Sequence, residues 1–244
     1  MIRIKKNTIL LCILILSVAI AGIHSEILGE NGFKVLIEDT TDVPKKFHPD
    51  SLAKYRGKSW KDIADSAHKN NSKFFTKKAG VTTVKINNNK TVQLVDKTFD
   101  DLDERIEETI VYNYMLFIPE IDSHLVVRGF YEGGDHILVS NKTGAIESIW
   151  NGIPGISPEK NRFAIASKDL IAQYSPNGIQ IFEIVSGNYI KQFQQEFDWG
   201  PDNIRWLSND TFIVDKYILD ADGMEKLAGQ VTVKLVAGKW ILEK

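Results

Sequence analysis

The segment YEGGDH, from Tyr131 to His136, gathers a phenol, two carboxylates and an imidazole within six residues. In an enzyme, Glu132 or Asp135 of such a segment would act as a general base, with His136 as its partner. The alternative is a hairpin connection in which the glycine pair supplies positive φ and the acidic side chains are solvated. The segment 43 residues further on, YSPNGI, is an ordinary turn and favours the connection. These three residues are therefore the candidates for catalysis, but no catalytic role is predicted for them.

Three further residues are candidates for binding a partner: Tyr131, Asp198 and Trp199. Trp199 lies in FDWGPD, a loop that precedes a β-rich run, where an aromatic ring would be available to a ligand. Its alternative role is packing in the core. Trp150 and Trp206 coincide with aromatic positions in another copy of the repeat described below, so we expect both in the core.

Several familiar catalytic motifs are absent from the sequence, namely G-x-S-x-G, H-E-x-x-H and a glycine-rich phosphate loop. The acidic stretch DDLDERIEE, which begins at Asp100, lacks the alternating oxygen ligands and the mid-loop glycine of a calcium loop, so we expect it to be solvated. No metal and no cofactor is predicted. With a formal net charge of −2 the chain is mildly acidic, and we expect no basic surface of the kind that nucleic acid requires.

The N-terminus has the pattern of a secretory signal peptide, residues 1–21. Basic residues precede the apolar run TILLCILILSV, and Ala19 and Ala21 stand at the positions before a cleavage site. An uncleaved anchor is the alternative. Cleavage removes Cys12, the one cysteine, and changes the formal charge to −5. We expect a periplasmic or secreted bacterial protein with no membrane span after cleavage.

Residues 22–80 are irregular in pattern, with one short helix predicted over residues 59–70. Its apolar stripe repeats with helical period, and Ser59 with Asp62 resembles a capping box. The stripe consists of Trp60, Ile63, Ala64 and Ala67. Residues 81–244 are a series of short β-rich runs separated by Gly, Pro and Asn, which indicates an all-β domain.

A repeat of about 43 residues runs through this β-rich part. At that offset Gly144 matches Gly187, Trp150 matches Phe193, and Arg162 matches Arg205. Three units follow: Pro119–Trp150, Ser157–Phe193 and Gly200–Leu242, the last with its turn DADG shifted to 36 residues after Gly187. The hairpin at residues 81–95, together with IVYNYMLF, would form a fourth unit. A period of this length with several strands in each unit is typical of propeller blades.

The run GIQIFEIVSGNYIKQF resembles the closing hairpin of a WD-repeat blade, and HILVSNKTGAIESIW resembles the matching part of quinoprotein-type blades. ISPEKNRFAIAS and WGPDNIRWLSNDTFIV resemble the opening turn and strand of such blades. The resemblance covers about residues 119–216, although the Trp-Asp and Gly-His pairs of WD repeats are missing. It implies an all-β, propeller-like array of about three to four small antiparallel sheets, with an open β-sandwich as the alternative. It implies no activity, because propellers carry unrelated functions.

These features together favour an exported, non-enzymatic binding module that binds another protein, as inhibitors and immunity proteins do. Two other classes stay open. One is a small hydrolase or glycan-active enzyme that uses loop carboxylates such as Glu132, Asp135 and Asp198. The other is a structural protein anchored in the envelope. A carbohydrate is the alternative ligand for the binding module.

Overall fold

The computed structural model describes residues 27–28, 34–35, 50–70 and 73–243 of the chain. By its contacts the chain divides into two units, Met1–Lys45 and Lys46–Lys244. In the first unit, β1 (Ile27–Leu28) pairs antiparallel with β2 (Lys34–Val35). The predicted signal peptide lies outside the described residues. No helix in the described ranges has the length and apolar character needed to cross a membrane.

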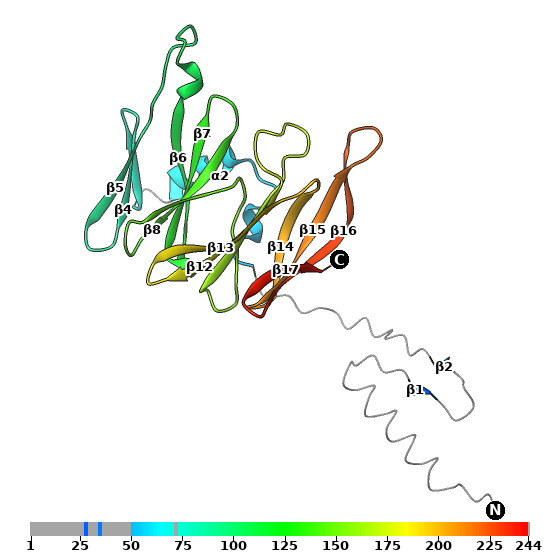
Figure 1. Cartoon of the computed structure of the whole chain (residues 1–244). Helices are drawn as coiled ribbons and strands as arrows, with labels where there is room; N and C mark the ends of the chain where they lie inside the picture. The colour runs from blue at the N-terminus through cyan, green and yellow to red at the C-terminus, as the bar shows by residue number, and fades with distance from the viewer. Residues whose placement is uncertain (1–26, 29–33, 36–49, 71–72, 244) are drawn as a thin grey trace, which may run out of the picture. The chain divides into compact units, whose positions relative to one another are not determined.

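Four antiparallel sheets form the second unit, each from strands that follow one another in the sequence (Figure 1). The first sheet contains β3 (Phe75–Lys78), β4 (Val81–Ile86) and β5 (Lys90–Val95). The second contains β6 (Ile110–Ile118), β7 (Ser123–Phe130), β8 (Gly134–Ser140) and β9 (Ile146–Ile149). The third contains β10 (Gly155–Ile156), β11 (Arg162–Ser167), β12 (Gly178–Val185) and β13 (Asn188–Glu196), and the fourth contains β14 (Gly200–Ser208), β15 (Thr211–Leu219), β16 (Glu225–Val236) and β17 (Lys239–Glu243). The predicted propeller-like array of small antiparallel sheets is confirmed.

The first sheet is completed differently from the prediction. The run IVYNYMLF, in β6, pairs with β7 and so opens the second sheet; it does not join the hairpin at residues 81–95. The turn after β6, η3 (Pro119–Ile121), returns the chain directly alongside it. The third strand of the first sheet is instead β3, which pairs with β4 and comes from the segment expected to be irregular.

Two-residue turns with positive φ close the last hairpin of three sheets. Asn88–Asn89, Ser186–Gly187 and Ala237–Gly238 each combine two positive φ values. This is the pattern of type I′ turns, whose twist matches that of paired strands. The prediction that matched DADG to Ser186–Gly187 is therefore wrong, because DADG joins β15 to β16 and Ser186–Gly187 joins β12 to β13. Because β15 and β16 are longer than β11 and β12, the closing turn of the fourth sheet lies further along the chain.

Apolar clusters lie between successive sheets. The first joins the first and second sheets, the second joins the second and third, and the third joins the third and fourth. Representative buried members of each are Val84 and Val126, then Leu138 and Phe182, then Ile181 and Phe212. Trp206 is buried, as predicted, whereas Trp150 and Phe193 are half-buried against these clusters.

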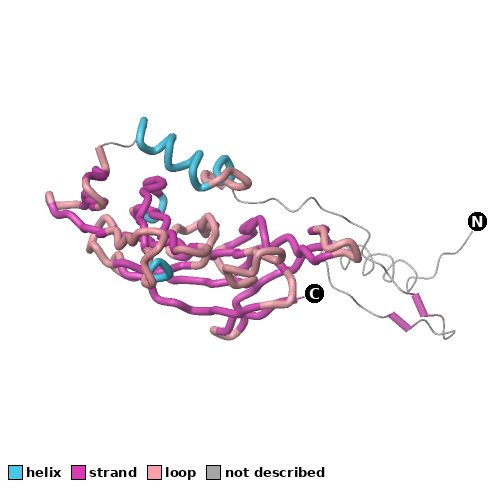
Figure 2. Tube along the Cα trace, turned by 90° about the horizontal axis from the view of Figure 1, so that it is seen from above, coloured by secondary structure: helices cyan, strands magenta, loops and turns pink. Residues whose placement is uncertain are grey.

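Helix α2 (Trp60–Asn70) covers one side of the strands (Figure 2). The amide of Asp62 donates to Ser59 Oγ at 3.1 Å, and the Ser59 hydroxyl donates to the Asp62 carboxylate at 2.7 Å, so the predicted cap is present. Ile63 and Ala67 of the predicted stripe are buried, but Trp60 is 51% exposed. Two short 3₁₀ turns complete the described elements, η1 (Ala53–Tyr55) and η2 (Ile106–Glu108).

The first and fourth sheets lie at opposite ends of the array (Figure 1). Each presents a largely polar outer face. On the fourth sheet, Asp215 is buried and accepts hydrogen bonds from Arg205 at 2.9 Å and Gln230 at 3.1 Å. On the first sheet, Thr91 and Gln93 of β5 are exposed. In the described residues, these two sheets are the ends of the array.

Candidate functional site

The strand connections gather at two ends of the array, and these ends differ in character. We call one of them the lower end. It holds the first and last turns of each four-stranded sheet, and it also holds the β4–β5 turn of the first sheet. The upper end holds the middle hairpin of each sheet and the connections between sheets. The upper connections are residues 96–109, 131–133, 150–154, 168–177, 197–199 and 220–224. They lie at the top of Figure 1.

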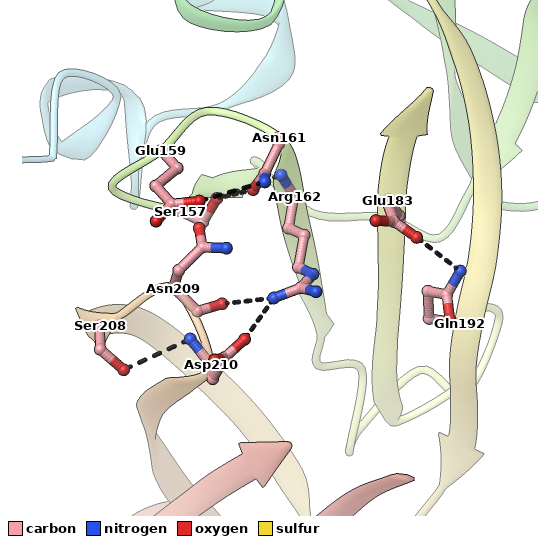
Figure 3. Close-up of polar contacts among 9 residues, drawn as sticks. All are labelled: Ser157, Glu159, Asn161, Arg162, Glu183, Gln192, Ser208, Asn209 and Asp210. Atoms are coloured by element: carbon pink, nitrogen blue, oxygen red, sulfur yellow. Dashed lines mark hydrogen bonds and ion pairs between the residues drawn. The ribbon is translucent and has the colours of Figure 1, made fainter. Parts of the chain in front are cut away.

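At the lower end, neighbouring sheets are tied together by hydrogen bonds. The amide of Asn87 donates to the carbonyl of Asn141 at 2.9 Å, and the Thr143 hydroxyl donates to the carbonyl of Gly187 at 3.1 Å. Between the third and fourth sheets, Arg162 donates to the carbonyl of Asn209 at 3.1 Å (Figure 3). Every successive pair of sheets is therefore fixed at this end by at least one polar contact.

The upper end contains a cleft formed by two adjoining cavities of about 340 and 480 Å³. Both cavities are lined by Trp60, His136, Asn151 and Lys168, which come from α2, the second sheet, the connection after β9 and the loop after β11. We call this the upper cleft. Its residues are far apart in sequence and are brought together by the side-by-side packing of the sheets.

The structure places part of YEGGDH in the upper cleft. Asp135 and His136 line it, whereas Glu132 and Tyr131 are exposed nearby. Asp135 is bound on both oxygens by Arg128, with Nε at 2.9 Å and Nη2 at 2.5 Å. This ion pair also raises the pKa of Arg128. The carboxylate is therefore occupied by a guanidinium and is poorly placed to remove a proton from a ligand.

His136 is a buried residue of the cleft wall, with 4% of its surface exposed. Its Nδ1 accepts a hydrogen bond from the amide of Gly152 at 3.2 Å. Burial lowers the pKa of His136 to about 4, so the ring is neutral near pH 7. It therefore holds the connection after β9 against the second sheet.

Trp199 lies in the core, in keeping with the packing alternative for it. It is 8% exposed and stacks on Phe197 with ring centroids 4.5 Å apart. The exposed Asp198 precedes it and does not line the upper cleft. The aromatic residue pair at alternate positions, Phe197 and Trp199, is the sequence signal that these rings pack together.

Two aromatic residues that sequence reasoning missed line the upper cleft beside Trp60. Phe130 is 39% exposed and Tyr174 is 60% exposed. The loop that carries Tyr174 approaches Gly133 closely: a Cβ on Gly133 would stand 2.8 Å from Cβ of Tyr174. A glycine is therefore required where the two loops meet, and its φ of +77° has the same consequence.

Asp169 fixes the loop that carries Tyr174. Its carboxylate accepts hydrogen bonds from the backbone amides of Ala172 at 3.2 Å, Tyr174 at 2.8 Å and Ser175 at 3.0 Å. Aspartate at the start of a loop commonly makes such bonds to its own backbone. This carboxylate, like that of Asp135, therefore has a structural role.

Lys168 lines both cavities and joins the third sheet to the fourth. Its Nζ lies 2.7 Å from the Glu225 carboxylate and 3.4 Å from that of Asp202. Burial acts to lower the pKa of Lys168, but the two carboxylates outweigh it and the pKa is raised. The amine is therefore a cation near pH 7 and does not serve as a base. Within the described residues, no group of three His, Cys, Asp or Glu side chains is arranged to hold a metal ion.

Large apolar side chains are exposed at the upper end, some of them in the cleft. They lie on α2, on the upper connections and on the projecting β15–β16 hairpin, whose tip is at the top of Figure 1. We call them the apolar rim: Trp60, Leu102, Phe130, Tyr131, Ile171, Tyr174, Ile218, Leu219, Met224 and Leu227. Exposed apolar groups gathered in one region are typical of interaction sites.

No family model and no curated protein matches the chain. Among solved structures, the chain is similar to one from Saccharomyces cerevisiae in which Dbp5 is bound to Nup159, Gle1, IP6 and ADP. The identity is 14% and the TM-score 0.33, and the match covers 70% of this chain and 46% of that one, so the chain spans about half of its length. A candidate 6-phosphogluconolactonase from Bacteroides fragilis matches with 9% identity and a TM-score of 0.28, over 70% and 72% of the two chains. Likenesses at this level carry no information about activity.

Proposed function

We propose that this protein is an exported, non-enzymatic binding module whose upper end binds another protein in the bacterial periplasm, as an inhibitor or immunity protein does. One observation carries the proposal: the upper end holds a cleft lined by the partly exposed rings of Trp60, Phe130 and Tyr174, and further large apolar side chains are exposed at the same end. Aromatic side chains at a partly exposed cleft are typical of protein interfaces.

The ionisable groups of the upper cleft support binding over catalysis. Asp135 is paired with Arg128, and Lys168 is paired with Glu225. The Asp169 carboxylate holds its own loop, and His136 is buried against Gly152. General acid–base chemistry needs a group within reach of the substrate's proton, and each of these is already engaged by the fold.

The second, third and fourth sheets also fit blades of the WD-repeat and quinoprotein type. Each has four strands in sequential order, and their first strands begin at Ile110, Gly155 and Gly200. Their upper connections would then be the variable loops of the blades. Loops on a rigid scaffold commonly carry function, which agrees with binding at this end.

Affinity capture with matched variants tests the proposed function. The tagged mature protein, its Trp60→Ala/Tyr174→Ala variant and a Val185→Ser variant are each incubated with an extract of the bacterial envelope. Val185 is exposed and lies beside the Ser186–Gly187 turn of the lower end, so it is the matched control. We expect one partner to be retained by the wild type and by Val185→Ser and to be lost by the double variant. Equal retention by all three proteins would contradict the proposal.

Two further measurements separate the alternatives. A turnover of any hydrolase substrate that disappears in Glu132→Gln or Asp198→Asn would indicate an enzyme. The mass of the exported product decides between a cleaved and an anchored form. We expect the N-terminus of the product to follow residue 21, and the full 244 residues in the membrane fraction would indicate an anchored protein instead.

A further inference from the structure

The upper end differs from the lower end in charge. Its connections hold a set of exposed carboxylates, which we call the acidic rim: Asp100, Asp101, Glu104, Glu107, Glu132, Asp198, Asp220 and Asp222. Two basic residues of the same connections, Lys97 and Arg105, are already paired with Glu108 and Asp103. The exposed charge of these connections is therefore strongly negative, although the whole chain has a formal charge of only −2 and the exposed Lys58 lines the cleft beside α2.

The exposed charges of the lower end are mixed by contrast. Exposed lysines at its turns include Lys90, Lys142 and Lys239, and exposed acids include Glu159 and Asp210. Asp210 is paired with Arg162. The negative field is therefore a local property of the end that carries the cleft, and does not follow from the composition of the chain.

The apolar rim and the acidic rim alternate along the chain. Leu102, which is 100% exposed, lies between Asp101 and Asp103. Tyr131 precedes Glu132, and Leu219 precedes Asp220. In Figure 1 the segment before β6 and the tip of the β15–β16 hairpin stand on opposite sides of the loops that border the cleft. Both segments therefore present apolar and acidic groups together at the upper end.

From this charge complementarity we propose that the upper end docks a cationic, amphipathic protein segment, in which apolar side chains alternate with Lys and Arg. The inference rests on the proposed function and names the chemistry of its partner. An apolar anchor of the segment enters the upper cleft between Trp60, Phe130 and Tyr174. Its basic side chains face the acidic rim.

The carboxylates that line the upper cleft differ from those of the acidic rim, and this difference supports the arrangement. The carboxylates that line the cleft are engaged within the fold: Asp135 pairs with Arg128, Asp202 pairs with Lys168, and Asp169 accepts hydrogen bonds from backbone amides of its own loop. The carboxylates of the rim are exposed instead. Charges at the edge of an interface mainly speed association and select partners, while the desolvated centre supplies most of the affinity. Nucleic acid and anionic membranes, which present negative charge, would be repelled by the same rim.

Selection of peptides from a random library displayed on phage tests the proposal. The bait is the immobilised mature protein, and the selected sequences are then made as synthetic peptides. We expect them to be enriched in Lys and Arg placed next to apolar residues. We also expect their binding to be lost with the Trp60→Ala/Tyr174→Ala variant.

Association kinetics of these peptides supply the second measurement. A rim variant, Asp101→Asn/Glu104→Gln/Glu132→Gln/Asp222→Asn, is compared with a lower-end control, Glu159→Gln/Glu183→Gln. The control residues are drawn in Figure 3. Because steering by charge accelerates association by about tenfold or more, we expect the rim variant to associate about tenfold more slowly at low salt and the control to be unchanged.

The outcomes separate the two proposals. Peptides that bind at the cleft but show no enrichment in basic residues would overturn the inference and leave the proposed function standing. The same holds if the rim variant associates as fast as the wild type. If no peptide binds the wild type better than the Trp60→Ala/Tyr174→Ala variant, both proposals fail. Equal thermal unfolding midpoints for all variants ensure that the comparison reports binding and not misfolding.

Discussion

The two ends of the sheet array are formed by the same strands but differ in the length of their connections and in the contacts between sheets. At the lower end the turns are short, and hydrogen bonds such as the one from Arg162 to Asn209 join one sheet to the next. At the upper end the connections are longer, and they leave Tyr174 and Met224 more than half exposed. In the proposed function, the lower end stabilises the fold and the upper end binds the partner. Loss of the hydrogen bonds that join sheets at the lower end should therefore destabilise the fold, and loss of exposed side chains at the upper end should mainly alter binding.

The largest effect is expected from the core that supports both ends. Phe182 is fully buried and stacks on Phe163 with centroids 4.8 Å apart. Phe182→Ala removes this ring and leaves a cavity, so we expect the free energy of unfolding to fall by about 3–5 kcal/mol. Urea denaturation measures it, with the exposed Ile190→Ala as control. A loss no larger than that of the control would mean that the second and third sheets are not packed as described.

Acid should weaken the fold beneath the upper cleft. Burial lowers the pKa of His136 to about 4 from the ordinary 6.5, so the unfolded chain takes up this proton first as the pH falls. The stability is therefore fully present above pH 6.5 and declines toward pH 4, by up to about 3 kcal/mol. Burial also lowers the pKa of His124, which adds to the same trend.

Denaturation curves recorded across this pH range check the expectation. His136→Gln should flatten the part of the pH dependence that belongs to this residue, while the contribution of His124 persists. A free energy of unfolding that stays constant between pH 6.5 and pH 4 would show that His136 is not held neutral in the folded chain.

A smaller loss of stability is expected at the lower end. Arg162 binds the carbonyl of Asn209 and the carboxylate of Asp210, and its side chain is 17% exposed. Arg162→Ala leaves a half-buried carbonyl without this donor, so we expect a loss of about 1–3 kcal/mol. Lys239→Ala, an exposed cation of the same end, is the control. Equal stability of the two variants would contradict the view that hydrogen bonds at the lower end stabilise the packing of neighbouring sheets.

The smallest effect on stability is expected at the upper end. Trp60→Ala/Tyr174→Ala removes two side chains that are 51% and 60% exposed, so the free energy of unfolding should change by about 0.5 kcal/mol or less. The same variant should nevertheless lose binding. If it lost as much stability as Arg162→Ala, these rings would belong to the scaffold, and the distinction between the two ends would fail.

Much of the fold is predictable because its signals are local. Ser186–Gly187 between two β-rich runs indicates a hairpin, and the match of Gly144 to Gly187 indicates a repeated sheet. The DADG turn misled the alignment because a turn signal does not say which hairpin of a sheet it closes. The strand β6 was assigned to the wrong sheet for a similar reason, since pairing partners are set by packing and not by composition.

The candidate site is less predictable because it is assembled from distant residues. YEGGDH does border the cleft, but its carboxylate Asp135 is paired with Arg128, a partner that the local pattern does not reveal. Trp60 and Tyr174 are separated by more than half of the second unit, and neither lies in a motif. Their convergence depends on the order in which the sheets pack, which only the folded structure shows.

The most direct test of the account is the affinity of a captured partner for matched variants of the two ends, measured by titration calorimetry. We expect Trp60→Ala/Tyr174→Ala to weaken binding by at least about tenfold, which corresponds to 1.4 kcal/mol. Val185→Ser at the lower end should leave the affinity unchanged. An affinity that falls with Val185→Ser and persists in the double variant would contradict the assignment of recognition to the upper end.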